Sequence, residues 1–235
     1  MTIRTALVTG TAQGIGLAIA QELSKRDHQV IGVDVKPHKD DAIELALVAD
    51  LGEIDECLRV VAEGGQVDIL VNNAAVIIQK PVEEFGMDDF DRTIAVNLRA
   101  PFLLSRELVP AMASRGWGRI INISSIGARL GGVADSAVYA ATKAGLISFA
   151  KNFARNFGPS GVTANAVAPG GIRTPMSAAI FARDPSFEPA ITEQIPLRRI
   201  ADPSEVASVV AFLASDAGGY INGATIDVNG GWLMT

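Results

Sequence analysis

The stretch VTGTAQGIG, residues 8–16, joins a short β-branched run to a segment of helical period. Its glycines at positions 10, 14 and 16 permit a tight turn and a close approach of a ligand to the backbone. A helix that begins here offers free N–H groups and a positive dipole end, which suit a pyrophosphate group. The spacing is G-x-x-x-G-x-G rather than G-x-G-x-x-G, so the glycines alone are also compatible with a ligand-free turn. Their position between strand and helix favours a dinucleotide-binding loop.

Short apolar runs alternate with helical segments along the whole chain. We expect strands over residues 5–9, 29–34, 45–49, 67–72, 118–124, 162–168 and 224–228. Helices are expected over residues 16–26, 53–63, 88–112 (interrupted at Pro101), 138–157 and 203–215. Strands with continuous apolar runs are buried on both faces, as in a parallel sheet. The pattern therefore predicts a Rossmann-type, doubly wound α/β fold: a seven-stranded, mainly parallel sheet with helices on both faces.

No linker, repeat or low-complexity tract divides the chain, so we expect a single domain over residues 1–235. Two stretches look irregular. Residues 36–44 leave little room for a full crossover helix between two strands. Residues 176–200 contain prolines at 185, 189 and 196 among scattered apolar residues, which favours a substrate-binding flap that moves.

Composition excludes several classes of function. The formal net charge is −6 and the pI is about 5.0, so the chain lacks the basic surface that nucleic-acid binding requires. One cysteine, Cys57, excludes an internal disulfide, and the two histidines make no metal-site spacing. There is no signal-peptide pattern and no apolar run of transmembrane length, which predicts a soluble, cytoplasmic protein with no membrane partner.

Asp34 ends the second expected strand, where a carboxylate accepts hydrogen bonds from the adenosine ribose hydroxyls. A 2′-phosphate at this point would meet like-charge repulsion. Residues 11–13 supply no cation to hold that phosphate, and Lys36 is the one cation nearby. The pattern predicts NAD rather than NADP as the cofactor, although a carboxylate that merely caps a turn remains an alternative for Asp34 alone.

The stretch VYAATKAG, residues 138–145, places Tyr139 and Lys143 one helical turn apart on one face. Read alone, the pair is either a snorkelling lysine beside an amphipathic tyrosine or a proton-transfer pair. In the second case a nearby ammonium lowers the pKa of the phenol, whose usual value of about 10 is too high for base catalysis near neutrality.

Together these motifs resemble the short-chain dehydrogenase/reductase family over essentially the whole chain. The matching segments are Thr9–Gly16, Asp50–Leu51, Asn72–Ala75, Asn97 in VNL, Ser125 after ISS, Tyr139 with Lys143, and Pro169–Thr174. Two departures are visible: Ala75 stands where the family has glycine more often, and the crossover over residues 36–44 is short.

The resemblance implies a catalytic set. Tyr139 would be the general acid/base, and Lys143 would hold the nicotinamide ribose and tune the phenol. Ser125 would bind the substrate oxygen, and Asn97 would bind a water that links Lys143 to solvent. We favour Ser125 over Ser124 because it is the last residue of the motif and successive strand residues point to opposite faces.

The resemblance also implies the residues that hold NAD. They are Gly10, Gln13, Gly14, Ile15, Gly16, Asp34, Asp50, Leu51, Asn73, Ala74, Tyr139, Lys143, Pro169, Gly170, Ile172 and Thr174. Substrate specificity should come from residues 76–78, 126–132 and 176–200, and Trp232 could cover a pocket or pack on a neighbour. The resemblance implies a homotetramer, assembled through residues 88–112, residues 138–157 and the last strand.

The expected activity is hydride transfer between NAD(H) and a small or cyclic secondary alcohol or ketone. One alternative is an NADPH-dependent reductase of 3-oxoacyl groups on a carrier protein. Asp34 and the acidic pI argue against it. Another is a regulator that senses NAD(H) without turnover. The complete catalytic set argues against this alternative. Arg129 and Arg173 are possible anion ligands. The pair Arg198–Arg199 is expected to be a solvated or interface feature rather than a substrate clamp, and Cys57 to fill the core or an interface.

Overall fold

The computed structural model describes residues 3–132 and 135–234. Within these residues seven strands form one sheet in the order β3-β2-β1-β4-β5-β6-β7, and each neighbouring pair is parallel. The strands are β1 (Thr5–Thr9), β2 (Gln29–Asp34), β3 (Leu45–Val48), β4 (Ile69–Asn72), β5 (Gly118–Ile123), β6 (Val162–Pro169) and β7 (Thr225–Val228). The predicted fold is confirmed, and the described sheet is parallel throughout.

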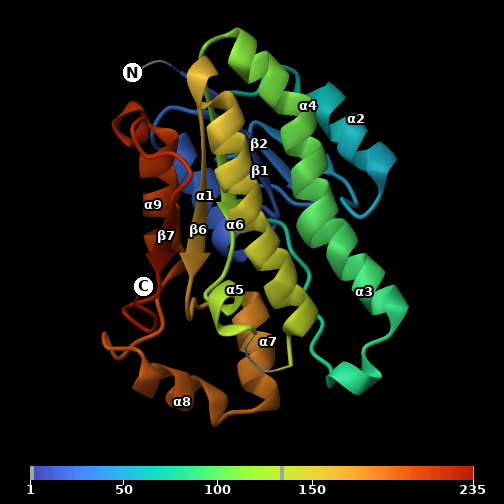
Figure 1. Ribbon diagram of the computed structural model, residues 1–235, viewed down its shortest axis with the longest axis vertical. Helices are drawn as coiled ribbons and strands as arrows, with labels where there is room; N and C mark the ends of the chain where they lie inside the picture. The colour runs from blue at the N-terminus through green and yellow to red at the C-terminus, as the bar shows by residue number, and fades with distance from the viewer. Residues whose placement is uncertain (1–2, 133–134, 235) are drawn as a thin grey trace.

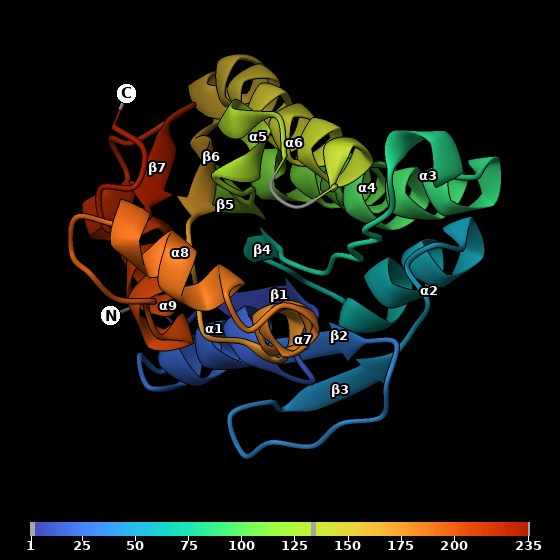
Figure 2. The same cartoon turned by 90° about the horizontal axis from the view of Figure 1, so that it is seen from below.

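Helices cover both faces of the sheet (Figures 1 and 2). Helices α1 (Gly14–Ser24) and α9 (Pro203–Ala214) pack on one face, and α2 (Ile54–Gly64), α4 (Ala100–Ser114) and α6 (Ala137–Phe157) on the other. Side chains alternate between the two layers: in β1, Leu7 joins the α2–α4–α6 core, whereas Ala6 and Val8 join the α1–α9 core. Both faces are thereby buried, which explains the continuous apolar runs.

The strand order reverses between β1 and β4. The connections that leave these two neighbours run to opposite faces of the sheet, because β1 leads into α1 and β4 leads toward α3 (Met87–Ile94) and α4. In parallel α/β sheets this reversal opens a crevice at the carboxyl ends of the strands. The fold therefore brings the glycine loop after β1 next to the Asn72–Ala75 segment after β4.

Residues 36–44 form no helix at all, whereas the sequence predicted only that a full crossover helix would not fit. Instead the segment lies against the sheet: Ile43 packs so closely over Gly32 that a Cβ on Gly32 would lie 3.0 Å from it. His38 Nε2 lies 2.8 Å from Thr11 Oγ1, and Asp40 accepts a hydrogen bond from Gln21 of α1 at 3.0 Å. These contacts fasten the segment beside the glycine loop.

The predicted interruption at Pro101 is wrong. Helix α3 continues through a π-helical turn, η2 (Ala95–Arg99), directly into α4, whose first turn contains Pro101. A π-helical turn shifts the hydrogen-bond register by one residue, so the missing N–H of a proline just after it does not break the helix.

Residues 176–200 are more regular than predicted. They hold most of α7 (Pro175–Arg183) and all of α8 (Phe187–Gln194), which lie across the carboxyl ends of the strands (Figures 1 and 2). Their motion as a flap stays a prediction. The remaining short elements are η1 (Val82–Glu84), α5 (Gly127–Leu130), η3 (Gly158–Ser160) and η4 (Asp216–Gly218). Among the helices in the described ranges, none combines the length and apolarity needed to cross a bilayer.

Candidate active site

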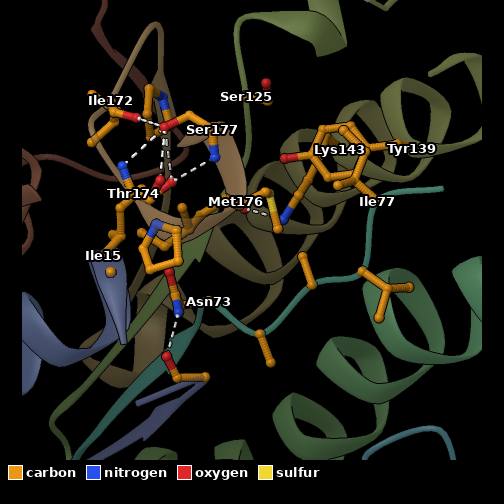
Figure 3. Close-up of a pocket in the computed structure, with 18 of the residues that line it drawn as sticks. Ile15, Asn73, Ile77, Ser125, Tyr139, Lys143, Ile172, Thr174, Met176 and Ser177 are labelled. Carbon is orange, nitrogen blue, oxygen red and sulfur yellow. Dashed lines mark hydrogen bonds between the residues drawn. The ribbon is translucent and has the colours of Figure 1, made fainter. Parts of the chain in front are cut away.

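A cavity of about 390 Å³ lies at the carboxyl ends of the strands, and Figure 3 shows part of its wall. Most of the residues that the sequence singled out line it. These are Gly10, Gln13, Gly14, Ile15, Asp34, Asp50, Leu51, Asn73, Ala74, Ser125, Tyr139, Lys143, Pro169, Gly170, Ile172 and Thr174. Gly16 and Asn97 do not line it, so the tertiary structure gives these two residues other tasks.

The glycine loop is shaped by close packing. Gly10 has φ +77°, and a Cβ there would lie 2.8 Å from Asn73 Nδ2. Gly16 is needed for contact within the protein rather than with a ligand, because its Cβ would lie 2.0 Å from the Gly10 carbonyl oxygen. No side chain caps α1 at Gln13, and its first turn carries no acidic residue. A helix N-terminus left open in this way fits a pyrophosphate group.

The Asp34 carboxylate is held by backbone N–H groups at the end of β2. One oxygen accepts from Ala12 at 2.9 Å and the other from Lys36 at 3.0 Å. Both bonds fix the carboxylate against the glycine loop at the cavity wall. Asp34 therefore caps the turn after β2, as the alternative interpretation expected, and the same bonds orient its carboxylate, whose remaining lone pairs suit ribose hydroxyls.

Asp50 has a partner that the sequence did not reveal. Arg92 of α3 reaches both of its carboxylate oxygens, at 2.9 and 3.0 Å, and itself lines the cavity. Burial opposes ionisation of Asp50, but the hydrogen bonds from Arg92 and the Gly52 N–H outweigh it and lower the pKa of the carboxyl group. The pair spans 42 residues of sequence, and no local pattern marks it.

Tyr139, Lys143 and Ser125 come together where α6 crosses the end of β5. The Tyr139 hydroxyl points into the space between Ser125 and Met176 (Figure 3). Lys143 Nζ donates a hydrogen bond to the Ile123 carbonyl at 2.7 Å and lies 5.5 Å from the centre of the Tyr139 ring. Both residues line the cavity with Ser125, so α6 presents the pair to one site.

The geometry supports Ser125 over Ser124. The Ser124 hydroxyl is buried and donates to the Lys143 carbonyl at 2.8 Å, which fastens β5 to α6. Ser125 instead shares a hydrogen bond with the Tyr139 phenol and accepts one from the Gly127 N–H at 3.0 Å. Its hydroxyl is therefore the one placed to act with Tyr139.

Burial dominates the ionisation of both Tyr139 and Lys143. It raises the pKa of the phenol to about 12, against the opposing hydrogen bond from Ser125. It lowers the pKa of the Lys143 ammonium to about 7. The expected lowering of the phenol pKa by Lys143 is therefore not found, because desolvation favours the neutral form of each group and is the largest cause of each shift.

Asn97 is fully buried in the π-helical turn and holds the segment after β4. Its side-chain oxygen accepts from the Val76 N–H and its amide donates to the Val76 carbonyl, both at 2.8 Å, with a longer bond to Thr142. This two-way contact fixes the backbone at Val76, which lines the cavity. The predicted water-binding role of the side chain stays a prediction; the structure makes it a positioning residue.

The other charged candidates are engaged elsewhere. Arg129 pairs with Asp227 at 2.9 Å, Arg173 with Glu188 at 3.3 Å, and Arg199 with Glu205 at 2.6 Å. Arg198 donates to the Glu193 carbonyl. Cys57 is buried in α2, and burial raises the pKa of its thiol to about 11, as a core residue should show.

Comparison with known proteins agrees with this geometry. A family model described as Enoyl-(Acyl carrier protein) reductase matches residues 10–233. The 3-oxoacyl-[acyl-carrier-protein] reductase FabG of Escherichia coli is 39% identical over 242 residues, covering 98% of each chain. Nodulation protein G of Azospirillum brasilense is 37% identical over 247 residues, again covering 98% of each.

The chain belongs to the short-chain dehydrogenase/reductase family. A solved structure with the same fold is a putative NAD(P)-dependent gluconate 5-dehydrogenase from Beutenbergia cavernae, with a TM-score of 0.93, 35% identity and coverage of 99% of this chain and 97% of that one. As a short-chain dehydrogenase/reductase, the protein is an oxidoreductase that binds a nicotinamide cofactor. The glycine loop, the open end of α1 and Asp34 fit that cofactor.

Proposed function

We propose that the protein is an NAD-preferring oxidoreductase that interconverts a small or cyclic secondary alcohol and its ketone. One observation carries this proposal: Ser125, Tyr139 and Lys143 share a cavity with an oriented Asp34 and with the apolar walls of α7 and α8. The proposed partner is thus a small molecule. The complete set of polar groups at the reacting end favours turnover over passive sensing.

Nicotinamide, when bound, supplies or accepts the hydride. In the reductive direction the Ser125 hydroxyl donates a hydrogen bond to the substrate oxygen, and Tyr139 gives its proton to that same oxygen. In the oxidative direction Tyr139 removes the hydroxyl proton. Lys143 uses one N–H on the Ile123 carbonyl, so its remaining donors can bind the ribose hydroxyls. A charged Lys143 then also stabilises the phenolate.

Preference for NAD rests on Asp34. Its fixed carboxylate repels a 2′-phosphate, and the N–H groups of Ala12 and Lys36 are already bonded to it. Several solved relatives were crystallised with NADP or NADPH, among them a putative 2-deoxy-D-gluconate 3-dehydrogenase from Agrobacterium tumefaciens that is 32% identical, with a TM-score of 0.91 and coverage of 97% of this chain and 96% of that one. The proposed preference for NAD therefore differs from the cofactor bound in those relatives, and within this chain it rests on the Asp34 carboxylate.

The second candidate is an NADPH-dependent 3-oxoacyl-carrier reductase. It is favoured by the names of relatives such as the E. coli reductase. The two candidates differ in cofactor and in substrate, and each is open to assay.

The test is a substrate panel followed by absorbance at 340 nm. We expect the purified protein to oxidise secondary alcohols faster with NAD than with NADP. Rapid reduction of acyl thioesters with NADPH would instead favour the carrier-linked enzyme. Tight NADH binding without turnover of any substrate would favour a sensor.

We also propose the homotetramer. Phe102 of α4 is 43% exposed and lies 5.5 Å, between ring centres, from Phe149 of α6. Phe149 is partly buried, so the exposed part of this aromatic pair is the ring of Phe102, which suits contact with a second copy. Light scattering at assay concentration should give four times the 24.6 kDa chain mass.

A further inference from the structure

The C-terminal segment of residues 229–234 is fastened to the end of α8. The Leu197 N–H donates to the Gly230 carbonyl at 3.2 Å. Gly230 and Gly231 have φ +65° and +85°, and a Cβ on each would lie 2.7 Å from Ile195 and 3.0 Å from Pro196, respectively. Both the conformation and the contact require glycine, so the segment is built to lie against this part of the chain.

The side chain of Trp232 makes a further attachment. Its indole N–H donates to Gln194 Oε1, the last residue of α8, at 3.2 Å. Its ring packs with Phe181 and Phe187 on an apolar cluster of Ile191, Ile195 and Ile200. This cluster is separate from the two cores that flank the sheet, so α7, α8 and Trp232 hold one another in place.

Trp232 also lines the cavity that contains Tyr139 and Ser125. The wall that it completes is apolar and contains Met176, Ile180, Phe181, Phe187 and Ile191. Among the described lining residues the cations other than Lys143 are Lys36 and Arg92, and Arg92 is bonded to Asp50. A wall of aromatic and aliphatic side chains binds a flat or puckered apolar ring better than a charged sugar acid.

We infer that Trp232 determines substrate specificity by forming the aromatic wall for a ring-bearing ketone or alcohol, and that Gln194 positions it by latching the C-terminal segment to α8. This inference rests on the proposed function and names its substrate class. The wall is the face of the Trp232 ring that lines the cavity, and the latch is the hydrogen bond from its indole N–H to Gln194. The two can be tested separately.

Kinetics test the wall, with cyclohexanone and butan-2-one as substrates and NADH as reductant. Trp232→Ala should lower kcat/KM for cyclohexanone about tenfold or more, mainly through KM, and change that for butan-2-one less than about threefold. Trp232→Phe keeps a ring and should retain most of the preference. Equal losses for both ketones, or none, would overturn the assignment of Trp232.

Limited proteolysis tests the latch without any turnover. Arg183 is exposed at the end of α7, two residues after Phe181, and is a site for trypsin. Gln194→Leu and Trp232→Phe both remove the hydrogen bond and should speed cleavage there, because local opening becomes easier. Gln194→Glu keeps an acceptor oxygen and should be cleaved at the wild-type rate. Unchanged cleavage in Gln194→Leu would overturn the latch.

Ring selectivity and the proposed activity are overturned by different results. A wild-type enzyme that reduces other carbonyl compounds but not cyclohexanone overturns ring selection and leaves the proposed function intact. A wild-type protein that reduces no carbonyl compound overturns both, and proteolysis then decides the latch alone.

Discussion

The Lys143 ammonium lies 5.5 Å from the centre of the Tyr139 ring, and it is held there by a hydrogen bond to the Ile123 carbonyl. Lys143 is only 2% exposed. Because both groups share a desolvated site, burial lowers the pKa of the lysine to about 7 and raises that of the phenol to about 12. The two side chains are therefore close enough to act together, whereas burial favours the neutral form of each.

Removing the phenol hydroxyl should abolish turnover. We expect Tyr139→Phe to lower kcat by about 100-fold or more, because the substitution removes the proposed acid/base from the substrate oxygen. NADH affinity, measured by fluorescence titration, should change little. Tyr220→Phe is the matched control, since Tyr220 is fully exposed and outside the cavity. Retained activity in Tyr139→Phe would exclude Tyr139 as the acid/base.

Lys143 should make stability depend on pH. Its folded pKa of about 7 lies below its usual value of 10.5, so between these values the unfolded chain binds more protons. The free energy of unfolding should therefore rise with pH across that window, by at most about 1.4 kcal/mol per pH unit from this group. Lys143→Met removes the buried charge and should raise Tm relative to wild type more at pH 6 than at pH 9.

The control for that experiment is Lys151→Met, because Lys151 is exposed on the same helix. Its Tm difference from wild type should not depend on pH. A Lys143→Met difference that is the same at pH 6 and pH 9 would contradict the lowered pKa.

Neutralising Asp34 should relax cofactor choice. In Asp34→Asn the like-charge repulsion with a 2′-phosphate disappears, and the ratio of kcat/KM for NAD to that for NADP should fall about tenfold or more. Asp40→Asn is the control, because Asp40 lies six residues further on, outside the cavity wall, and bonds Gln21 and the N–H of Ala42. An unchanged ratio in Asp34→Asn would remove the basis for NAD preference.

Asn97 should matter for stability as well as for activity. Asn97→Ala leaves the Val76 N–H and carbonyl without their partner, which should lower the free energy of unfolding by about 2–3 kcal/mol in urea titrations. Asn156→Ala, on the exposed side of α6, should stay within about 0.5 kcal/mol of wild type. An Asn97→Ala protein as stable as wild type would show that the contact with Val76 contributes nothing.

The sequence by itself determined the sheet, the glycine loop and the reacting pair. These features depend on residues close together in the sequence, namely apolar runs of strand length, helical periods and the spacing of Tyr139 and Lys143. Such local patterns are largely retained when the chain folds. The lack of a full crossover helix after β2 could be predicted for the same reason, since the ten residues between β2 and β3 leave little room for one. The same local reasoning failed over residues 88–112. It predicted an interruption at Pro101, but a π-helical turn just before the proline lets the helix continue.

Only the tertiary structure decided which residues meet across long stretches of chain. Arg92 forms hydrogen bonds with Asp50 across 42 residues of sequence, and Trp232 forms one with Gln194 across 38. The Asn97 side chain is hydrogen-bonded to the backbone of Val76. No periodicity records such pairs, because they depend on how separate elements pack. Burial is also a tertiary property, which is why the direction of the Tyr139 pKa shift could be found in the folded chain and not in the spacing of two residues.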